Sequence, residues 1–284
     1  MGEYLRPKTL TAALEALAER PLRVLAGGTD HYPARLGGLP DEDLLDITAI
    51  KPLRLIEDKG DHWRIGALAT WSEVLDADLQ PLFDGLKAAA REIGGRQIQN
   101  AATVAGNLCN ASPAADGAPC LLSLDAAVEL TSRAGKVVVP LANFLRGNRD
   151  TVRKPDQLMT AIVVPRPKGE AAGAFVKLGA RAYLVISIVS VAAAFEIDMR
   201  RRLRVARVAI GSCAPTALRL PALEQALRGK ACDGALAEVT APSHFEALVP
   251  IDDVRASAAY RRDAAITLTR RLLGELGAGL GGAR

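Results

Sequence analysis

One segment, Thr103–Asp116, restricts what this chain can fold into more than any other part of the sequence. It reads T-V-A-G-N-L-C-N-A-S-P-A-A-D, carries a single charged residue and consists mostly of small side chains. The sequence predicts that it belongs to a long irregular region reaching about Ala118, and compact domains keep such loops mainly for function. Gly106 would let a ligand approach the backbone closely. Neutral donors and acceptors come from Thr103, Asn107, Asn110 and Ser112.

A second glycine-containing segment, Ala26–Asp30 (A-G-G-T-D), follows a predicted buried strand over residues 22–25. Successive amides at the end of such a strand can form a concave anion site. The two segments together could hold a diphosphate by backbone amides without a lysine, and the carboxylate of Asp116 suits ribose hydroxyls. Taken singly, each segment is more often just a tight turn, and Asp30 and Asp116 are more often helix caps.

The standard phosphate-binding motifs are missing from both segments. Neither contains G-x-G-x-x-G or G-x-x-x-x-G-K-[ST], which counts against a protein built around NAD or a nucleoside triphosphate. The four cysteines form no C-x-x-C pair, and the three histidines have no spaced partners, so we expect no metal bound by this chain. We also expect no catalytic acid, base or nucleophile.

Composition narrows the class of protein further. The chain has 284 residues, 49% of them hydrophobic, which is enough for two compact units. Its net charge of +4 comes from scattered basic residues, with one cluster at Arg200–Arg204 that we interpret as a solvated turn. We therefore expect no nucleic-acid partner. No apolar run reaches membrane-spanning length, and the N-terminus lacks a signal-peptide pattern, so we expect a cytoplasmic protein.

The order of predicted elements is that of an α+β chain. A βαβ-like opening is followed by hairpins and helices, including a helix begun by the capping-box pattern of Thr70 and Glu73. A linker at residues 165–169 leads to three strands over residues 174–178, 185–197 and 203–212. A helix over 257–276 follows. We expect domains at 1–168, divided near residue 52, and at 169–284.

On these residues, the chain resembles the FAD-binding medium subunit of the xanthine dehydrogenase and carbon monoxide dehydrogenase family of molybdenum hydroxylases. That family has an A-G-G-T-D-type loop, matched by Ala26–Asp30, and a T-x-G-G-N-x-x-x-x-S-P-x-x-D loop, matched by Thr103–Asp116. Ala105 stands where glycine is usual, which would cost stability if the backbone there needs a positive φ. The Arg181–Ser190 stretch differs from the xanthine-oxidising branch, which weakens xanthine as the substrate.

The resemblance implies a two-lobed FAD-binding fold, made of a small α+β unit and an antiparallel-sheet unit. A C-terminal domain of a three-stranded antiparallel sheet with helices would cover the flavin. It implies that the two glycine segments embrace the diphosphate, that Asp116 meets the adenosine ribose, and that Leu108 and Cys109 lie near the flavin ring. The implied cofactor-binding residues are Leu25, Ala26, Gly27, Gly28, Thr29, Asp30, Ile93, Thr103, Ala105, Gly106, Asn107, Leu108, Cys109, Ser112, Asp116, Met159 and Lys177.

The resemblance also implies partners. A large molybdenum-binding subunit with a molybdenum–pterin cofactor would oxidise the substrate, and a small subunit with [2Fe–2S] clusters would relay electrons to FAD on this chain. The assembly would be a dimer of heterotrimers, with NAD⁺, oxygen or another molecule as acceptor. Two alternatives stay open at this point: a self-contained FAD-dependent oxidoreductase of a related fold, and a scaffold that has lost FAD, for which Ala105 is the only support.

Overall fold

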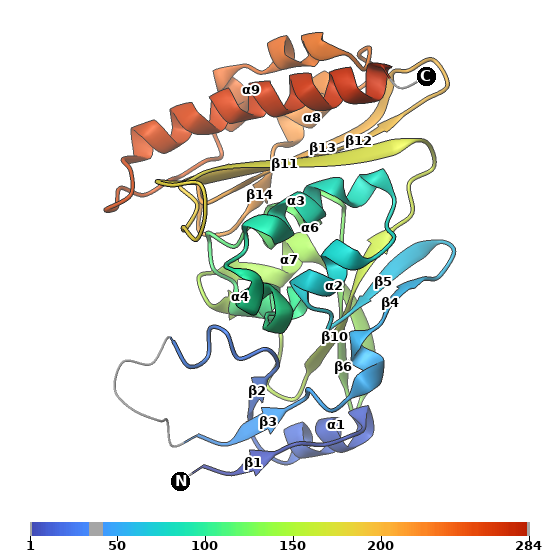
Figure 1. The fold of residues 1–284 in the computed structure, drawn as a ribbon, viewed down its shortest axis with the longest axis vertical. Helices are drawn as coiled ribbons and strands as arrows, with labels where there is room; N and C mark the ends of the chain where they lie inside the picture. The colour runs from blue at the N-terminus through green and yellow to red at the C-terminus, as the bar shows by residue number, and fades with distance from the viewer. Residues whose placement is uncertain (1, 34–41, 283–284) are drawn as a thin grey trace.

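The computed structural model describes residues 2–33 and 42–282 of the chain. Three larger sheets follow one another along the long axis of the molecule, with the N-terminal elements at one end and the C-terminal helix α9 at the other (Figure 1). Helices are interspersed between and around the sheets, so the predicted α+β class is confirmed.

The N-terminal unit is a small parallel sheet with the order β1-β3-β2, and one helix packs against it. Thr9 begins the helix by accepting a hydrogen bond from the amide of Ala12, and Leu14 and Leu17 are buried on one face. The parallel pairing that the sequence predicted is confirmed. Its elements are β1 (Tyr4–Leu5), α1 (Leu10–Glu19), β2 (Arg23–Leu25) and β3 (Leu44–Asp46).

The middle unit is an antiparallel sheet with the order β4-β5-β10-β6-β7, covered by short helices. The predicted capping box at Thr70 and Glu73 is present at the start of α2. Trp71 and Phe83 are fully buried in the core of this unit. Its strands are β4 (Ile56–Asp58), β5 (His62–Gly66), β6 (Ala127–Ser132), β7 (Gly135–Pro140), β8 (Leu145–Gly147), β9 (Asp150–Thr151) and β10 (Leu158–Pro165). Its helices are η1 (Lys51–Arg54), α2 (Trp71–Asp76), η2 (Pro81–Phe83), α3 (Asp84–Glu92), α4 (Arg96–Ala101), α5 (Val104–Asn110), α6 (Gly117–Ser123) and α7 (Leu141–Phe144).

The prediction of a long irregular region up to Ala118 was wrong, because α4 and α5 occupy most of it. The Oγ1 atom of Thr103 accepts a hydrogen bond from the amide of Gly106 at 3.0 Å and so begins α5. Small and apolar side chains then bury one side of this helix. A sequence of short polar and small residues is compatible with a loop or with a tightly packed helix, and here packing decides.

The C-terminal unit is an antiparallel sheet with the order β11-β12-β13-β14. Every residue of β12 is buried, because α9 covers one face of the sheet while α3 and α6 lie against the other (Figure 1). The three predicted strands are present, and the sheet also contains a fourth strand, the two-residue β14. The strand predicted from Val185 begins only at Val189. The elements are β11 (Ala171–Leu178), β12 (Val189–Ile197), β13 (Leu203–Gly211), β14 (Leu218–Arg219), α8 (Pro221–Leu227), η3 (Gly234–Val239), η4 (Pro242–Phe245) and α9 (Ala258–Gly282).

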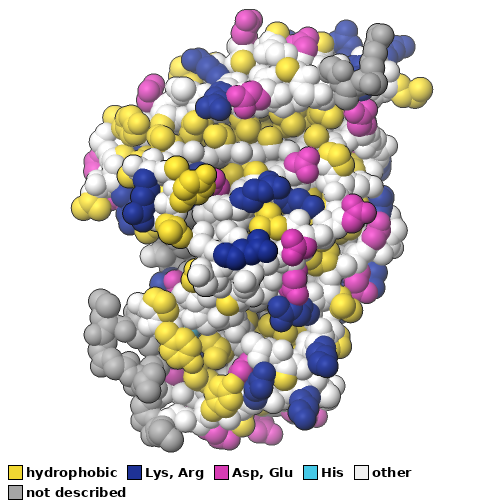
Figure 2. Space-filling view, in the orientation of Figure 1, with side chains coloured by type: hydrophobic (Ala, Val, Ile, Leu, Met, Phe, Trp, Pro, Cys, Tyr) yellow, Lys and Arg dark blue, Asp and Glu magenta, His cyan; other side chains and the backbone are white. Residues whose placement is uncertain are grey.

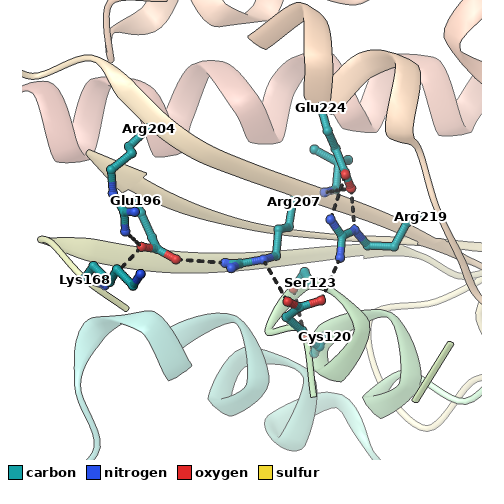
Figure 3. Close-up of polar contacts among 10 residues, drawn as sticks. Cys120, Ser123, Lys168, Glu196, Arg204, Arg207, Arg219 and Glu224 are labelled. Carbon is teal, nitrogen blue, oxygen red and sulfur yellow. Dashed lines mark hydrogen bonds and ion pairs between the residues drawn. The ribbon is translucent and has the colours of Figure 1, made fainter. Parts of the chain in front are cut away.

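A chain of ion pairs joins the inner face of this sheet to the end of α6 (Figure 3). The buried carboxylate of Glu196 contacts Arg204 and, at 3.1 Å, Arg207. Asp125 lies 3.9 Å from Arg207 and 3.3 Å from Arg219. These contacts link β12 and β13 to the middle unit, so the C-terminal domain is held by charged contacts as well as by apolar packing.

Candidate functional site: a cleft between the two glycine segments

A cleft of about 900 Å³ lies between the N-terminal and middle units. Its walls come from the first glycine segment after β2, from α5, from residues 149–153 around β9 and from the start of β10. A volume of this size is typical of sites for organic cofactors. The cleft therefore brings together segments that are far apart in the sequence.

The first glycine segment is pressed directly against the chain that leads into α5. A Cβ atom on Gly27 would lie 2.0 Å from the carbonyl oxygen of Ala101, so no larger residue fits without a backbone shift. Gly28 has a φ of +68°, a conformation that L side chains rarely adopt. The amides of Gly27, Gly28 and Thr29 donate no hydrogen bond to another described residue, so they are available to a ligand.

The second glycine segment presents fewer amides than the sequence suggested. Val104 donates its amide to the carbonyl of Ala69, while Gly106 and Asn107 donate theirs to Oγ1 and the carbonyl of Thr103. These amides are used within the fold. The amide of Ala105, which lines the cleft, donates to no described residue, so a contribution of this segment to diphosphate binding stays a prediction.

Ala105, which replaces the usual glycine, causes no backbone strain. It lies inside α5, is not among the residues with positive φ, and is 3% exposed at the wall of the cleft. The sequence predicted a loss of stability at Ala105 if the backbone there needs a positive φ. Because the backbone does not need one, this loss does not occur. The only support for a chain that has lost its cofactor is thereby removed.

Two arginines at the rim of the cleft were not singled out from the sequence. Arg149 lies on the turn between β8 and β9, and its guanidinium is 3.2 Å from the carboxylate of Asp30. Arg153 lies just after β9 and lines the same cleft. No motif marks either residue, and only the fold shows that this hairpin closes over the first glycine segment.

A separate buried polar cluster joins the start of α6 to β11. The ammonium of Lys177 donates to Asp116 at 2.9 Å, and the hydroxyl of Ser187 donates to the other oxygen of Asp116 at 2.6 Å. The side chains of Lys177 and Asp116 are only 6% and 7% exposed. Burial raises the pKa of Asp116, against the opposing charge of Lys177. The structure thus pairs two predicted site residues with each other.

The predicted site residues fall into two groups. Residues that line the cleft are Leu25, Ala26, Gly27, Gly28, Thr29, Asp30, Thr103, Ala105, Gly106, Cys109 and Met159. Residues outside its lining are Ile93, Asn107, Leu108, Ser112, Asp116 and Lys177. Leu108 is buried in the core and Ile93 packs against it, while Asn107 points its side-chain oxygen toward Gly117.

The chemistry of the cleft fits an anionic organic cofactor. Over residues 2–33 and 42–282, no group of three or more His, Cys, Asp or Glu side chains is arranged to hold a metal ion. None of the helices in these ranges is long and apolar enough to cross a membrane. On the face drawn in Figure 2, basic and acidic side chains are interspersed. Free amides beside Gly27 and two rim arginines instead suit a phosphate-bearing ligand.

The fold and cleft define an α+β dinucleotide-binding protein, and comparison with known proteins identifies its family. Residues 1–167 match the model of the FAD binding domain in molybdopterin dehydrogenase, and residues 174–276 match that of the CO dehydrogenase flavoprotein C-terminal domain. The chain belongs to this family of FAD-binding subunits of xanthine and carbon monoxide dehydrogenase-type molybdenum hydroxylases. It is an oxidoreductase subunit whose cofactor is FAD, and the resemblance found in the sequence is confirmed.

Individual relatives agree with this assignment over nearly the whole chain. The xanthine dehydrogenase FAD-binding subunit of Escherichia coli O157:H7 is 31% identical, covering 99% of this chain and 98% of the relative. The nicotinate dehydrogenase FAD-subunit of Eubacterium barkeri is 28% identical over 95% of this chain and 94% of its own length. Carbon monoxide dehydrogenase from Oligotropha carboxidovorans has a chain that superposes with a TM-score of 0.89 at 27% identity, covering 98% of both chains.

Proposed function

We propose that this chain is the electron-transferring medium subunit of a molybdenum hydroxylase. A small partner subunit with [2Fe–2S] clusters would deliver electrons to it, and a large partner with the molybdenum–pterin cofactor would oxidise the substrate. The chain would pass the electrons to NAD⁺, oxygen or another acceptor, within a dimer of heterotrimers. The cleft beside Gly27 carries this proposal, because it offers free amides and cations to one phosphate-bearing cofactor.

The cleft-lining residues among the predicted set are the ones we propose to hold FAD. Amides of the first glycine segment would bind the diphosphate, and Cys109 and Met159 would contact the cofactor further along the cleft. Bound FAD supplies reversible electron exchange. The protein's own residues then hold the cofactor in place and limit its contact with solvent.

The residues outside the cleft lining stay predictions. Direct contact of Lys177 or Asp116 with the cofactor requires the buried ion pair between them to open or to share its donors. In the arrangement described, Ser187 and the carbonyl of Val185 complete the hydrogen bonds of this pair. We propose that the pair positions the start of α6 and the 179–187 loop relative to the cleft.

We propose a division into domains at residues 1–168 and 169–284, and a cytoplasmic location. Support for the boundary comes from the break between the two family matches, at residues 167 and 174. Support for the location comes from the cysteines, all four of which are free. Free thiols are typical of a reducing compartment.

The proposal is tested by isolating the chain from its native source under mild conditions. We expect co-purification with two further polypeptides, bound flavin, and molybdenum and iron by metal analysis. The isolated chain loaded with FAD should show the visible flavin spectrum but should not bleach with candidate organic substrates. Substrate-dependent bleaching without any partner would instead identify a self-contained flavoenzyme, and a chain that stays colourless after incubation with FAD would refute cofactor binding.

A further inference from the structure

Two arginines stand where the cofactor's diphosphate would meet the first glycine segment. Arg149 and Arg153 both line the cleft, together with Gly27, Gly28 and Asp30. The amide of Arg149 donates to the carbonyl of Ala111 at 3.2 Å, which fixes the β8–β9 turn against the end of α5. The guanidinium of Arg149 extends from this anchored backbone to Asp30 in the glycine segment.

The ion pair between Arg149 and Asp30 is easy to exchange. Both side chains are more than half exposed, at 56% and 52%. Exposed pairs of this kind are worth little, about 0–1 kcal/mol, because water and salt compete for both charges. A phosphate placed against the amides of the glycine segment can therefore take over donors of Arg149 at small cost. A guanidinium can bind phosphate through two parallel hydrogen bonds.

Arg153 has donors to spare. Its Nη1 atom donates to the carbonyls of Lys154 and Gln157, at 3.1 Å and 2.7 Å. Its remaining N–H groups have no acceptor among the described residues, and no carboxylate there forms an ion pair with it. The loop bonds hold the guanidinium in place at the cleft while leaving its charge uncompensated. Such an arrangement suits an anion from outside the protein.

The second glycine segment offers fewer free amides than the first, which leaves a role for these cations. The amides of Val104, Gly106 and Asn107 are already bonded within the fold, which leaves the amide of Ala105 in this segment, while the first segment offers three consecutive free amides. A diphosphate carries about two negative charges, and placing them in a partly enclosed cleft is costly unless they are paired. Neutral amides on one side leave most of that charge uncompensated.

We propose that Arg149 and Arg153 form a cationic clamp for the diphosphate of the cofactor, with Arg149 moving from Asp30 to the phosphate on binding. This inference rests on the proposed binding of FAD in the cleft. It adds two binding residues and assigns them to one chemical group. The clamp thus adds positive charge to the free amides of the glycine segments.

The test compares FAD with riboflavin, which has the same flavin ring and no phosphate. Affinities of the full-length, cofactor-free chain are measured by flavin fluorescence at low and high salt. For the double variant Arg149→Gln, Arg153→Gln we expect FAD affinity to fall between about tenfold and a hundredfold. Its dependence on salt should flatten, and riboflavin affinity should stay the same. Arg146→Gln is the matched control, since Arg146 is exposed on the same hairpin but does not line the cleft.

Lysine variants distinguish a loss of positive charge in the clamp from a loss of folded structure. Arg149→Lys with Arg153→Lys keeps both charges but loses the forked geometry, so it should restore the salt dependence and part of the FAD affinity. Unchanged FAD affinity in the glutamine double variant would overturn the clamp. Equal losses for FAD and riboflavin would overturn it too, because they indicate a collapsed cleft. Failure of the unmodified chain to bind FAD would refute the proposed function itself, and the two failures are therefore distinguishable.

Discussion

Two ion pairs, one at the rim of the cleft and one outside its lining, differ in burial. The pair of Lys177 and Asp116 lies at 2.9 Å between the middle and C-terminal units, with both side chains almost fully buried. The pair of Arg149 and Asp30 lies at 3.2 Å across the rim of the cleft, with both side chains more than half exposed. The same type of contact therefore occurs in two settings: the buried pair joins the start of α6 to β11, and the exposed pair joins two walls of the cleft.

The largest effect is expected from breaking the buried pair on one side only. Lys177→Met should lower the free energy of unfolding by roughly 3–5 kcal/mol, because it leaves the carboxylate of Asp116 buried without its cation. Urea denaturation of the cofactor-free chain measures this change. Lys177→Met combined with Asp116→Asn removes the uncompensated charge and should recover a large part of the loss. If the single variant is as stable as the parent, the pair does not fix the domain contact.

The next largest loss of stability is expected from a substitution in the first glycine segment, the wall of the cleft that Arg149 contacts through Asp30. Gly27→Ala places a methyl group 2.0 Å from the carbonyl oxygen of Ala101, so the glycine segment must shift. We expect a loss of about 1–3 kcal/mol in stability and weaker FAD binding. Gly28→Ala is the comparison, because its virtual Cβ has room and only its φ of +68° is unfavourable. A smaller effect at Gly27 than at Gly28 would contradict the close packing of the two segments.

Measuring stability as a function of pH tests the buried pair through the titration of Asp116. Burial raises its pKa in the folded protein, so the folded state holds this proton more tightly than the unfolded chain. Relative to Asp116→Asn, which cannot titrate, stability should therefore increase as the pH falls through the folded pKa toward the lower unfolded pKa, and should level off below it. The slope cannot exceed that of one proton, about 1.4 kcal/mol per pH unit. A difference between the two proteins that is constant between pH 7 and pH 4 would argue against a raised pKa.

The two glycine segments show which structural features could be predicted from the sequence and which could not. For Ala26–Asp30, a strand followed by glycines correctly predicted a turn with free amides, because glycine conformations are a local property. For Thr103–Asp116, the same kind of reading failed. Whether threonine, alanine and glycine form a loop or a capped helix depends on the core into which Val104 and Leu108 pack, and that core is made by distant segments.

Long-range contacts explain the other differences. The helix of the βαβ-like opening, observed as α1, and the capping box at Thr70 depend on neighbours in the sequence and were predicted correctly. The approach of Arg149 to Asp30 joins residues from different units, and no local pattern encodes it. The pairing of Lys177 with Asp116 is of the same kind: the resemblance to the family named both residues, but only the fold shows that they are partners.

The smallest effect on stability is expected from the exposed pair itself. Arg149→Gln in the cofactor-free chain should change the free energy of unfolding by less than about 1 kcal/mol, since water replaces the lost contact on both sides. Urea denaturation alongside Lys177→Met gives the comparison directly. Asp30→Asn should have an equally small effect, because it removes the other half of the same contact. A loss as large as that at Lys177 would mean that Arg149 is needed to hold the hairpin against the glycine segment. A residue with that structural duty could not leave Asp30 for a phosphate, so the stability measurement bears directly on whether the rim of the cleft can open.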